Sequence, residues 1–217
     1  MGKATDICGA VEAELRFDPL VDAAGITVTS IGGDVALNGT VPSYPQHLQA
    51  AAAAQHVSGV QNVHNHLEVV LPPRDYRDDG RLAAAANNAL ALDVTVPDGV
   101  EATARNGNLT LTGTVTYGVQ RCAAERAVAG LVGVRNVRDY IEIGYGASPL
   151  DVNVLVQDAL DRYALIPDDS DVTADTSGNT VTLYGHVATW AEHDVVLGAA
   201  WMASGVDDVR DLLTITG

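Results

Sequence analysis

One short pattern occurs three times along this chain, and the repetition limits its fold more than any other feature. In each copy, alternating apolar residues end in a glycine, one further residue and a valine, at residues 35–41 (VALNGTV), 109–115 (LTLTGTV) and 181–187 (VTLYGHV). A Gly-Val-x-x-Val segment follows in every copy, at residues 59–63, 133–137 and 205–209. Both patterns recur at the same offsets, 74 and then 72 residues, and two independent patterns rarely share their spacing by chance. The sequence therefore predicts three tandem domains, at residues 6–72, 78–144 and 148–217.

Each copy shows the same order of expected elements. Apolar periodicity and capping residues predict a first helix at about 6–17, 79–92 and 149–163. A short strand is expected next, at about 26–30, 100–105 and 171–176. The alternating segments described above form the second strand, and a second helix follows at about 44–58, 117–131 and 189–204. The last strand is expected at about 62–70, 134–143 and 207–215.

This order, α-β-β-α-β, predicts an α+β fold of three two-layer sandwiches. Turn residues such as Asn106-Gly107 lie between the first two strands of each copy and indicate an antiparallel hairpin. The helix between the second and third strands predicts a parallel crossover. Each domain should therefore have a three-stranded mixed sheet with two helices on one face, while the other face is open to solvent, to a sister repeat or to a ligand.

Composition limits the function classes. The chain has 217 residues, is 47% hydrophobic and 18% charged, and carries a formal net charge of −16, which repels nucleic acid at long range. Its two cysteines lie at unrelated positions of different repeats, so no structural disulfide is expected. Neither a secretory signal nor a run of eighteen apolar residues is found, and the sequence predicts a cytoplasmic protein.

The repeated pattern resembles the BON domain. Copy 2 carries it most clearly, in residues 110–115 (TLTGTV), 121–127 (RCAAERA) and 133–137 (GVRNV), and the other copies match the same frame. Three such domains resemble the cytoplasmic, stress-associated relatives of the osmotically inducible protein OsmY. The resemblance implies binding without catalysis, to phospholipid, to proteins or, in one branch, to potassium. It implies only structural roles for its glycines, which are Gly39, Gly59, Gly113, Gly133, Gly185 and Gly205.

Charge is distributed unevenly among the copies. The first domain has one arginine against seven acidic residues, the second has six against eight, and the third has two against twelve. Contact with an anion or a lipid phosphate is therefore expected at the arginines of domain 2, namely Arg121, Arg126, Arg135 and Arg138. The alternative is that these arginines pair with acidic neighbours in the flanking domains.

The second helix of domain 3 carries an apolar stripe in addition to the one that faces its sheet. Val196, Ala199, Ala200 and Ala203 have the spacing of a sheet-facing stripe. Trp190, Leu197 and Trp201 cluster on a second stripe, and such a stripe usually marks an interface. We expect it to bind a partner protein or a second copy, and the alternative is packing against another domain of the same chain.

Two patterns have weaker links to metal ions. Asp168, Asp169 and Asp171 offer oxygen ligands to a hard cation such as Ca²⁺ or K⁺, although they lack the spacing of an EF-hand loop, and a solvated loop explains them equally. His64 and His66 lie two apart on an expected strand and share one face, but zinc would need further ligands. The simpler interpretation is that they are ordinary strand histidines.

No catalytic motif is present in the sequence. It contains no Gly-x-Ser-x-Gly, no phosphate-binding glycine loop with lysine and no Cys-x-x-Cys. We therefore predict a non-enzymatic, stress-associated binding or scaffold protein that has no cofactor and acts through protein contacts. The alternatives are a module responsive to K⁺ or Ca²⁺, and reversible docking on phospholipid through domain 2.

Overall fold

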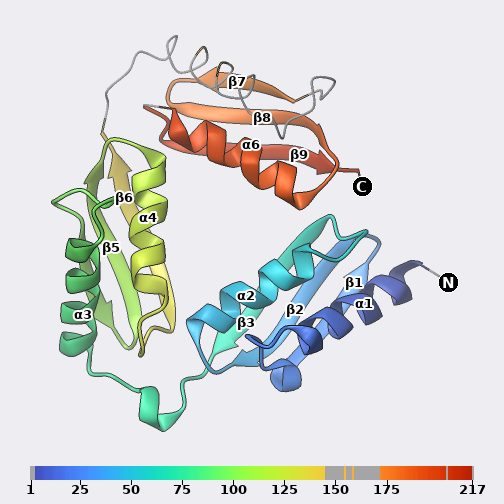
Figure 1. Cartoon of the computed structure of the whole chain (residues 1–217), viewed down its shortest axis with the longest axis horizontal. Coiled ribbons are helices and arrows are strands. Elements are labelled where there is room, and N and C mark those ends of the chain that lie inside the picture. The colour runs from blue at the N-terminus through green and yellow to red at the C-terminus, as the bar shows by residue number, and fades with distance from the viewer. Residues whose placement is uncertain (1–2, 145–153, 155–157, 159–171, 204, 217) are drawn as a thin grey trace. The chain divides into compact units, whose positions relative to one another are not determined.

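The computed structural model of the chain describes residues 3–144, 154, 158, 172–203 and 205–216. The helix expected at 149–163 and the aspartates at 168, 169 and 171 lie outside these residues, apart from 154 and 158. Each repeat is described by itself, and Figure 1 shows its elements in their sequence colours. None of the helices within the described residues has the length and apolar character to cross a membrane.

Repeat 1 contains all the predicted elements. They are α1 (Lys3–Phe17), η1 (Ala23–Gly25), β1 (Ile26–Ile31), β2 (Asp34–Val41), α2 (Tyr44–Gln55) and β3 (Asn62–Val69). The sheet has the order β1-β2-β3, with β1 antiparallel and β3 parallel to the central strand. Buried side chains of α1 (Val11 and Leu15) and α2 (Ala50 and Ala54) pack in one core cluster with Leu37 of β2. Both helices therefore contribute to the core of a two-layer sandwich.

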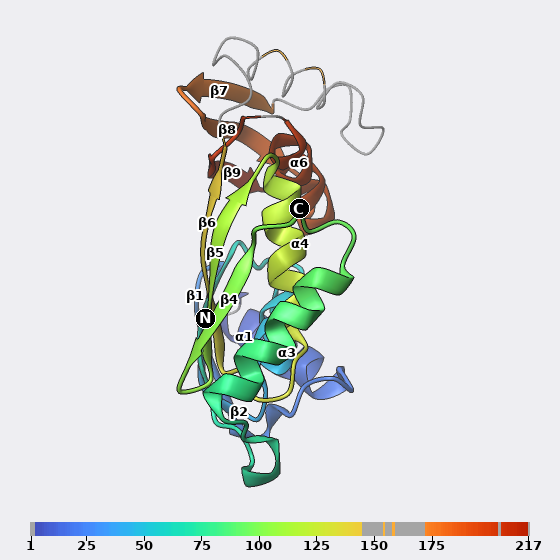
Figure 2. The same cartoon turned by 90° about the vertical axis from the view of Figure 1, so that its left-hand side faces the viewer.

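Repeat 2 has the same architecture after the short helix η2 (Pro73–Asp75). Its elements are α3 (Asp79–Leu92), β4 (Glu101–Arg105), β5 (Asn108–Val115), α4 (Gly118–Ala129) and β6 (Asn136–Ile143). The strand order is β4-β5-β6. Figure 2 shows α3 and α4 on the same side of this sheet. The opposite face of the sheet carries no helix of this repeat.

The described part of repeat 3 repeats the second half of this design. It consists of β7 (Thr173–Ser177), β8 (Thr180–Val187), α6 (Trp190–Met202) and β9 (Asp208–Ile215). β7 pairs antiparallel and β9 pairs parallel with the central β8. The sheet-facing stripe predicted on α6 is buried, since Val196, Ala199, Ala200 and Ala203 all belong to the core cluster. The predicted fold class, three mixed sheets with helices in an α+β arrangement, is confirmed.

Local sequence signals explain where the second helices begin. The Ser43 hydroxyl accepts a hydrogen bond from the N–H of Gln46 at 3.4 Å, and the Thr189 hydroxyl accepts one from Glu192 at 3.2 Å. In α6 the Glu192 carboxylate also accepts from the Ala188 N–H at 2.8 Å. These bonds satisfy amide groups that have no partner inside the helix. The second helices of repeats 1 and 3 therefore start at a fixed point after the central strand.

The glycine near the end of the central strand is required by a close approach of two backbone segments. Gly39 has a φ of +123°, and an added Cβ there would lie 2.0 Å from the carbonyl oxygen of Gly25. Its equivalent Gly113 has a φ of +140°, and an added Cβ would lie 2.4 Å from the Gly99 oxygen. No other residue type fits such a conformation at such short range. The segment just before the first strand therefore packs directly against the backbone of the central strand at this glycine.

Candidate functional site

A polar contact joins the second helix to the last strand at one equivalent position in each repeat. The helix residue is His47, Arg121 or His193, and the strand residue is Asn65, Asp139 or Asp211. These residues follow one another at the same offsets of 74 and 72 as the repeat itself. In every repeat the strand side chain also accepts a hydrogen bond from the backbone N–H two residues later. We call this position the helix–strand contact.

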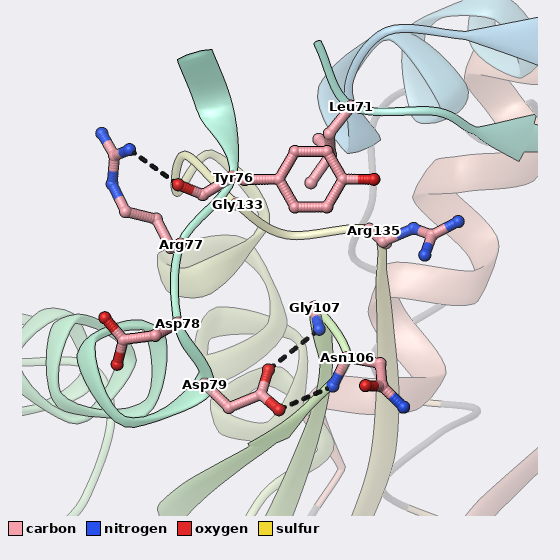
Figure 3. A pocket seen from close by; sticks show the side chains of 9 residues that line it. All are labelled: Leu71, Tyr76, Arg77, Asp78, Asp79, Asn106, Gly107, Gly133 and Arg135. Atoms are coloured by element: carbon pink, nitrogen blue, oxygen red, sulfur yellow. Dashed lines mark hydrogen bonds between the residues drawn. The ribbon is translucent and has the colours of Figure 1, made fainter. Parts of the chain in front are cut away.

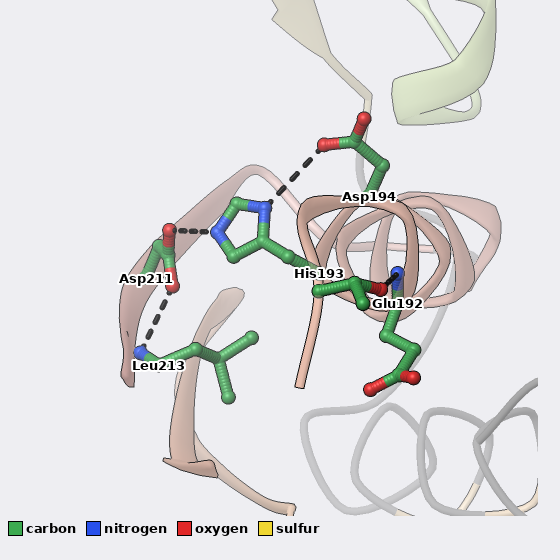
Figure 4. Close-up of polar contacts among 6 residues, drawn as sticks. Glu192, His193, Asp194, Asp211 and Leu213 are labelled. Atoms are coloured by element: carbon green, nitrogen blue, oxygen red, sulfur yellow. Dashed lines mark hydrogen bonds and ion pairs between the residues drawn. The ribbon is translucent and has the colours of Figure 1, made fainter. Parts of the chain in front are cut away.

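In repeat 3 the helix–strand contact is a histidine–aspartate pair, shown in Figure 4. His193 is buried, and its Nε2 lies 2.7 Å from a carboxylate oxygen of Asp211. The second ring nitrogen lies 3.4 Å from the exposed carboxylate of Asp194. The other oxygen of Asp211 accepts from the Leu213 N–H at 3.0 Å. The Trp190 ring meets the imidazole edge to face, with their centroids 4.9 Å apart.

In repeat 2 the same position holds a permanent ion pair. The Arg121 Nε donates to one carboxylate oxygen of Asp139, and the N–H of Ile141 donates to the other at 2.8 Å. The Asp139 side chain is only 6% exposed. Burial, followed by the nearby negative charge of Asp139, raises the pKa of the Glu125 carboxyl. Arg121, Asp139 and Glu125 therefore form a cluster of partly buried charged groups, and water screens their interactions only weakly.

In repeat 1 the contact is neutral on the strand side. The Asn65 amide donates to the backbone carbonyl of His47 at 2.7 Å, and its oxygen accepts from the Leu67 N–H at 3.2 Å. The His47 ring nitrogen Nδ1 lies 3.0 Å from the Leu67 carbonyl oxygen. The strand residue thus bonds a helix backbone carbonyl in repeat 1 and a helix side chain in repeats 2 and 3, and each contact links the second helix to the sheet.

Sequence inspection did not find this contact. Arg121 was singled out for its charge, whereas Asp139 and Asp211 were not singled out. A signal was present, since the aligned position on the last strand is Asn or Asp in all three copies. It lies between outward-facing neighbours, so a polar residue is directed to the helix side of the sheet. The contact contains no serine, threonine or cysteine nucleophile beside its histidines, and its geometry is that of a structural fastening.

A pocket of about 610 Å³ lies at the start of repeat 2. Figure 3 shows the nine residues that line it, which are Leu71, Tyr76, Arg77, Asp78, Asp79, Asn106, Gly107, Gly133 and Arg135. Its volume falls in the range of small-molecule sites. Which ligand the pocket could bind therefore depends on whether its charged side chains already have partners within the protein.

The acidic groups of this pocket are bound to the protein itself. The Asp79 carboxylate accepts hydrogen bonds from the N–H groups of Asn106 at 2.8 Å and Gly107 at 3.1 Å. These bonds lower the pKa of Asp79. Asp78 accepts from the N–H of Arg81 at 3.0 Å and thereby caps α3. The two carboxylates therefore fasten the linker and the β4–β5 turn to α3.

The two arginines of the pocket each donate hydrogen bonds to backbone carbonyls. Arg77 donates to the carbonyls of Arg74 and Tyr76, at 3.3 and 3.1 Å. Arg135 donates to the Val69 carbonyl at 3.2 Å. The pocket holds no nucleophile beside a general base, so its arrangement does not indicate catalysis.

The four arginines predicted to meet an anion are not brought together as one group. Arg121 pairs with Asp139 of its own repeat, and Arg135 lies 3.7 Å from Glu68 of repeat 1. The Nε of Arg126 donates to the Cys122 carbonyl at 3.3 Å, and Arg138 is exposed on β6. Contact with lipid phosphate stays a prediction.

The apolar stripe predicted on α6 is half-buried. Leu197 and Trp201 both pack against the edge of the repeat 3 core. Trp201 and Arg121 belong to one compact unit of the chain, and the guanidinium carbon lies 5.9 Å from the centroid of the indole. An added Cβ at Gly118 would lie 2.2 Å from the same indole. Binding of a partner by the stripe stays a prediction, and so does its packing against another domain of the chain.

The histidine pair of repeat 1 lies on the open face of its sheet. His64 and His66 are exposed on β3, with ring centroids 6.4 Å apart and ring planes 7° from parallel. Among the described residues, no group of three or more histidine, cysteine, aspartate or glutamate side chains is placed to hold a metal ion. The remaining predicted glycines, Gly59, Gly133, Gly185 and Gly205, have φ values of +89°, +104°, +123° and +84°.

Comparison with known proteins agrees with the repeat structure. A family profile described as the BON domain matches residues 3–70, 78–145 and 151–217. The chain belongs to the BON-domain family. It is a tandem protein of three BON domains, and that family is in general non-enzymatic, with members known in stress responses and at membranes. No curated protein matches the chain.

Solved structures resemble this BON protein only distantly. The C-terminal domain of CdsD, the structural protein of the type III secretion system of Chlamydia trachomatis, is 14% identical, with a TM-score of 0.27. The match covers 99% of this chain and all of that one. A second CdsD structure is also 14% identical, with a TM-score of 0.26, and the match covers 97% of this chain and 92% of that one.

Proposed function

We propose that this three-BON protein is a non-catalytic binding protein that acts through protein–protein contacts, including contacts with further copies of itself. The observation that carries the proposal is an exposed apolar turn, which occurs at the end of the first helix in both repeats 1 and 2. In repeat 1, Phe17 and Leu20 are 82% and 64% exposed. In repeat 2, Leu92 and Val94 are 84% and 99% exposed.

The recurrence of these exposed side chains in two repeats supports a role for them in binding. Single exposed apolar residues are common on proteins, but Leu20 and Val94 occupy equivalent positions at the offset of 74. Neither residue serves its own core, and the loop that carries it is held by polar bonds. Asp18 accepts from the Leu20 N–H at 2.8 Å, and Asp93 accepts from the Thr95 N–H at 2.9 Å. Each turn therefore presents apolar side chains on a fixed backbone.

Large apolar side chains on a fixed loop fit best into an apolar groove of a partner. A partner that offers such a groove is a protein. The net charge of −16 opposes approach to anionic lipid, and two of the four arginines proposed for lipid contact are paired with carboxylates. The resemblance to osmotically inducible relatives supports a role in the cytoplasm under stress. The alternatives are a response to K⁺ or Ca²⁺ and phospholipid docking through Arg126 and Arg138.

Photo-crosslinking in living cells tests the proposal. A photoreactive residue at position 94 should form covalent adducts with protein, because this side chain projects into the contact. The same residue at position 31 is the matched control, since Ile31 is also exposed, at 86% against 99% for Val94, but is the last residue of β1. Adducts from position 94 that are lost in the Phe17→Ser, Leu20→Ser, Leu92→Ser chain support the proposal. Equal adducts from both positions, or none from position 94, contradict it.

A further inference from the structure

The open face of repeat 1 carries two histidines that the proposed function does not use. Positions 64 and 66 alternate with inward-facing residues of β3, so both side chains project from the face opposite the helices. Among the described residues, neither ring nitrogen of His64 or His66 has a hydrogen-bond partner, whereas the rings of His47 and His193 are bound to the protein. The two rings stack on each other.

We propose that His64 and His66 form a chelating site for a late first-row divalent metal ion such as Ni²⁺, Cu²⁺ or Zn²⁺. Imidazole nitrogens are ligands that these ions favour. The rings already lie together, with centroids 6.4 Å apart and planes nearly parallel. A metal bound at 2.0–2.1 Å from two nitrogens requires those nitrogens to be roughly 3 Å apart. Rotation of the two exposed side chains about their own bonds brings them to that separation.

The strand beneath the two rings is held in place by the residue between them. Asn65 projects to the other face, where it bonds the His47 carbonyl and the Leu67 N–H. β3 is also paired along its length with β2, with Ala36 opposite His64 and Asn38 opposite His66. The backbone that presents the imidazoles is therefore ordered before any metal arrives, which lowers the entropic cost of binding.

The surrounding charge favours a cation. Repeat 1 has one arginine against seven acidic residues. Because no third histidine, cysteine or carboxylate is placed with this pair among the described residues, water completes the coordination. The equivalent positions are Arg138 and Tyr140 in repeat 2, and Arg210 and Leu212 in repeat 3. The site is therefore a feature of repeat 1 alone.

Calorimetric titration of the full, untagged chain with NiCl₂ tests this site. Ni²⁺ is the chosen probe because imidazole suits it, whereas the cysteine sulfur of Cys8 and Cys122 favours softer ions. The wild-type chain should bind one Ni²⁺, and His64→Ala or His66→Ala should each weaken binding at least about tenfold, since loss of even an indirect ligand contact costs that much. His56→Ala removes an exposed histidine away from the pair and is the matched control.

The same titration at acid pH adds a second readout. Metal binding requires neutral imidazole, so the affinity of the wild-type chain should fall as the pH is lowered. Circular dichroism shows whether the variants remain folded, which we expect because both side chains are exposed. The site is disproved if the wild-type chain takes up no Ni²⁺, or if the two single variants and the His56 control bind it as tightly as wild type does.

Discussion

Repeats 2 and 3 put different side chains into one geometry where the second helix meets the last strand. Arg121 and Asp139 pair a guanidinium with a carboxylate, whereas His193 and Asp211 pair an imidazole ring with a carboxylate. In both repeats the aspartate also accepts a backbone N–H two residues later. The comparison shows that the fold requires the acceptor on the strand, while the group on the helix is free to vary.

The two contacts also differ in their exposure to water. The Asp139 side chain is 6% exposed and the Asp211 side chain is 36% exposed. When a buried polar group loses its partner, it stays without a hydrogen bond and the protein bears the full desolvation cost. When the group is exposed, water takes the place of the lost partner. The contact in repeat 2 should therefore be the more important of the two for stability.

The largest effect is expected for Asp139→Ala. This change leaves the Arg121 guanidinium without its carboxylate and the Ile141 N–H without an acceptor. We expect the free energy of unfolding of repeat 2 to fall by about 2–3 kcal/mol. Hydrogen exchange in β6 peptides of the full chain measures it, because exchange reports the stability of each repeat separately.

The neutral contact of repeat 1 supplies the control for that experiment. Asn65→Ala removes the equivalent side-chain acceptor of a backbone N–H, that of Leu67, without leaving a charge behind, and should cost repeat 1 about 1 kcal/mol. A cost for Asp139→Ala no larger than that for Asn65→Ala would show that the ion pair adds nothing to the shared geometry.

An intermediate effect is expected for Asp211→Ala in repeat 3. The change removes the bonds to the His193 ring and to the Leu213 N–H, but water reaches this site. We expect a loss of about 1–2 kcal/mol, measured by hydrogen exchange in β9 peptides at neutral pH. Unchanged exchange in β9 would mean that the histidine–aspartate pair does not hold α6 to its sheet.

The repeat frame could be predicted because it depends on local patterns. Apolar alternation, the Asn106-Gly107 turn and the capping residues of the first helices each act within a few residues, so the order of elements follows from them. The helix ends differ from the prediction by a few residues, as when α2 ends at Gln55 rather than near residue 58. The last turn of a helix is set by packing that no local pattern contains.

The helix–strand contact could not be predicted because it depends on register. Arg121 and Asp139 lie 18 residues apart, and only the placement of α4 over β6 brings them together. The sequence suggested that the arginines of domain 2 either face an anion or pair with flanking domains, while Arg121 pairs inside its own repeat. Aligned polar residues at 65, 139 and 211 carried the missing signal, but repeat 1 has Asn where the others have Asp, which conceals it from a search for carboxylates.

The smallest effect, and the one that depends on pH, is expected at the start of repeat 2. Bonds from the Asn106 and Gly107 N–H groups lower the pKa of Asp79 below its ordinary 3.8, and repeat 1 has Thr5 at the equivalent position. A carboxylate with a lowered pKa adds stability above its ordinary value, and that contribution disappears as the pH falls through the folded-state value. Asp79→Asn should therefore lower the melting temperature of the chain at pH 7, and the gap from wild type should close toward pH 3. Asp98→Asn, which removes an exposed carboxylate of the same repeat, controls for net charge. A gap that persists undiminished at pH 3 would show that the loss in Asp79→Asn does not arise from the lowered pKa of the carboxyl.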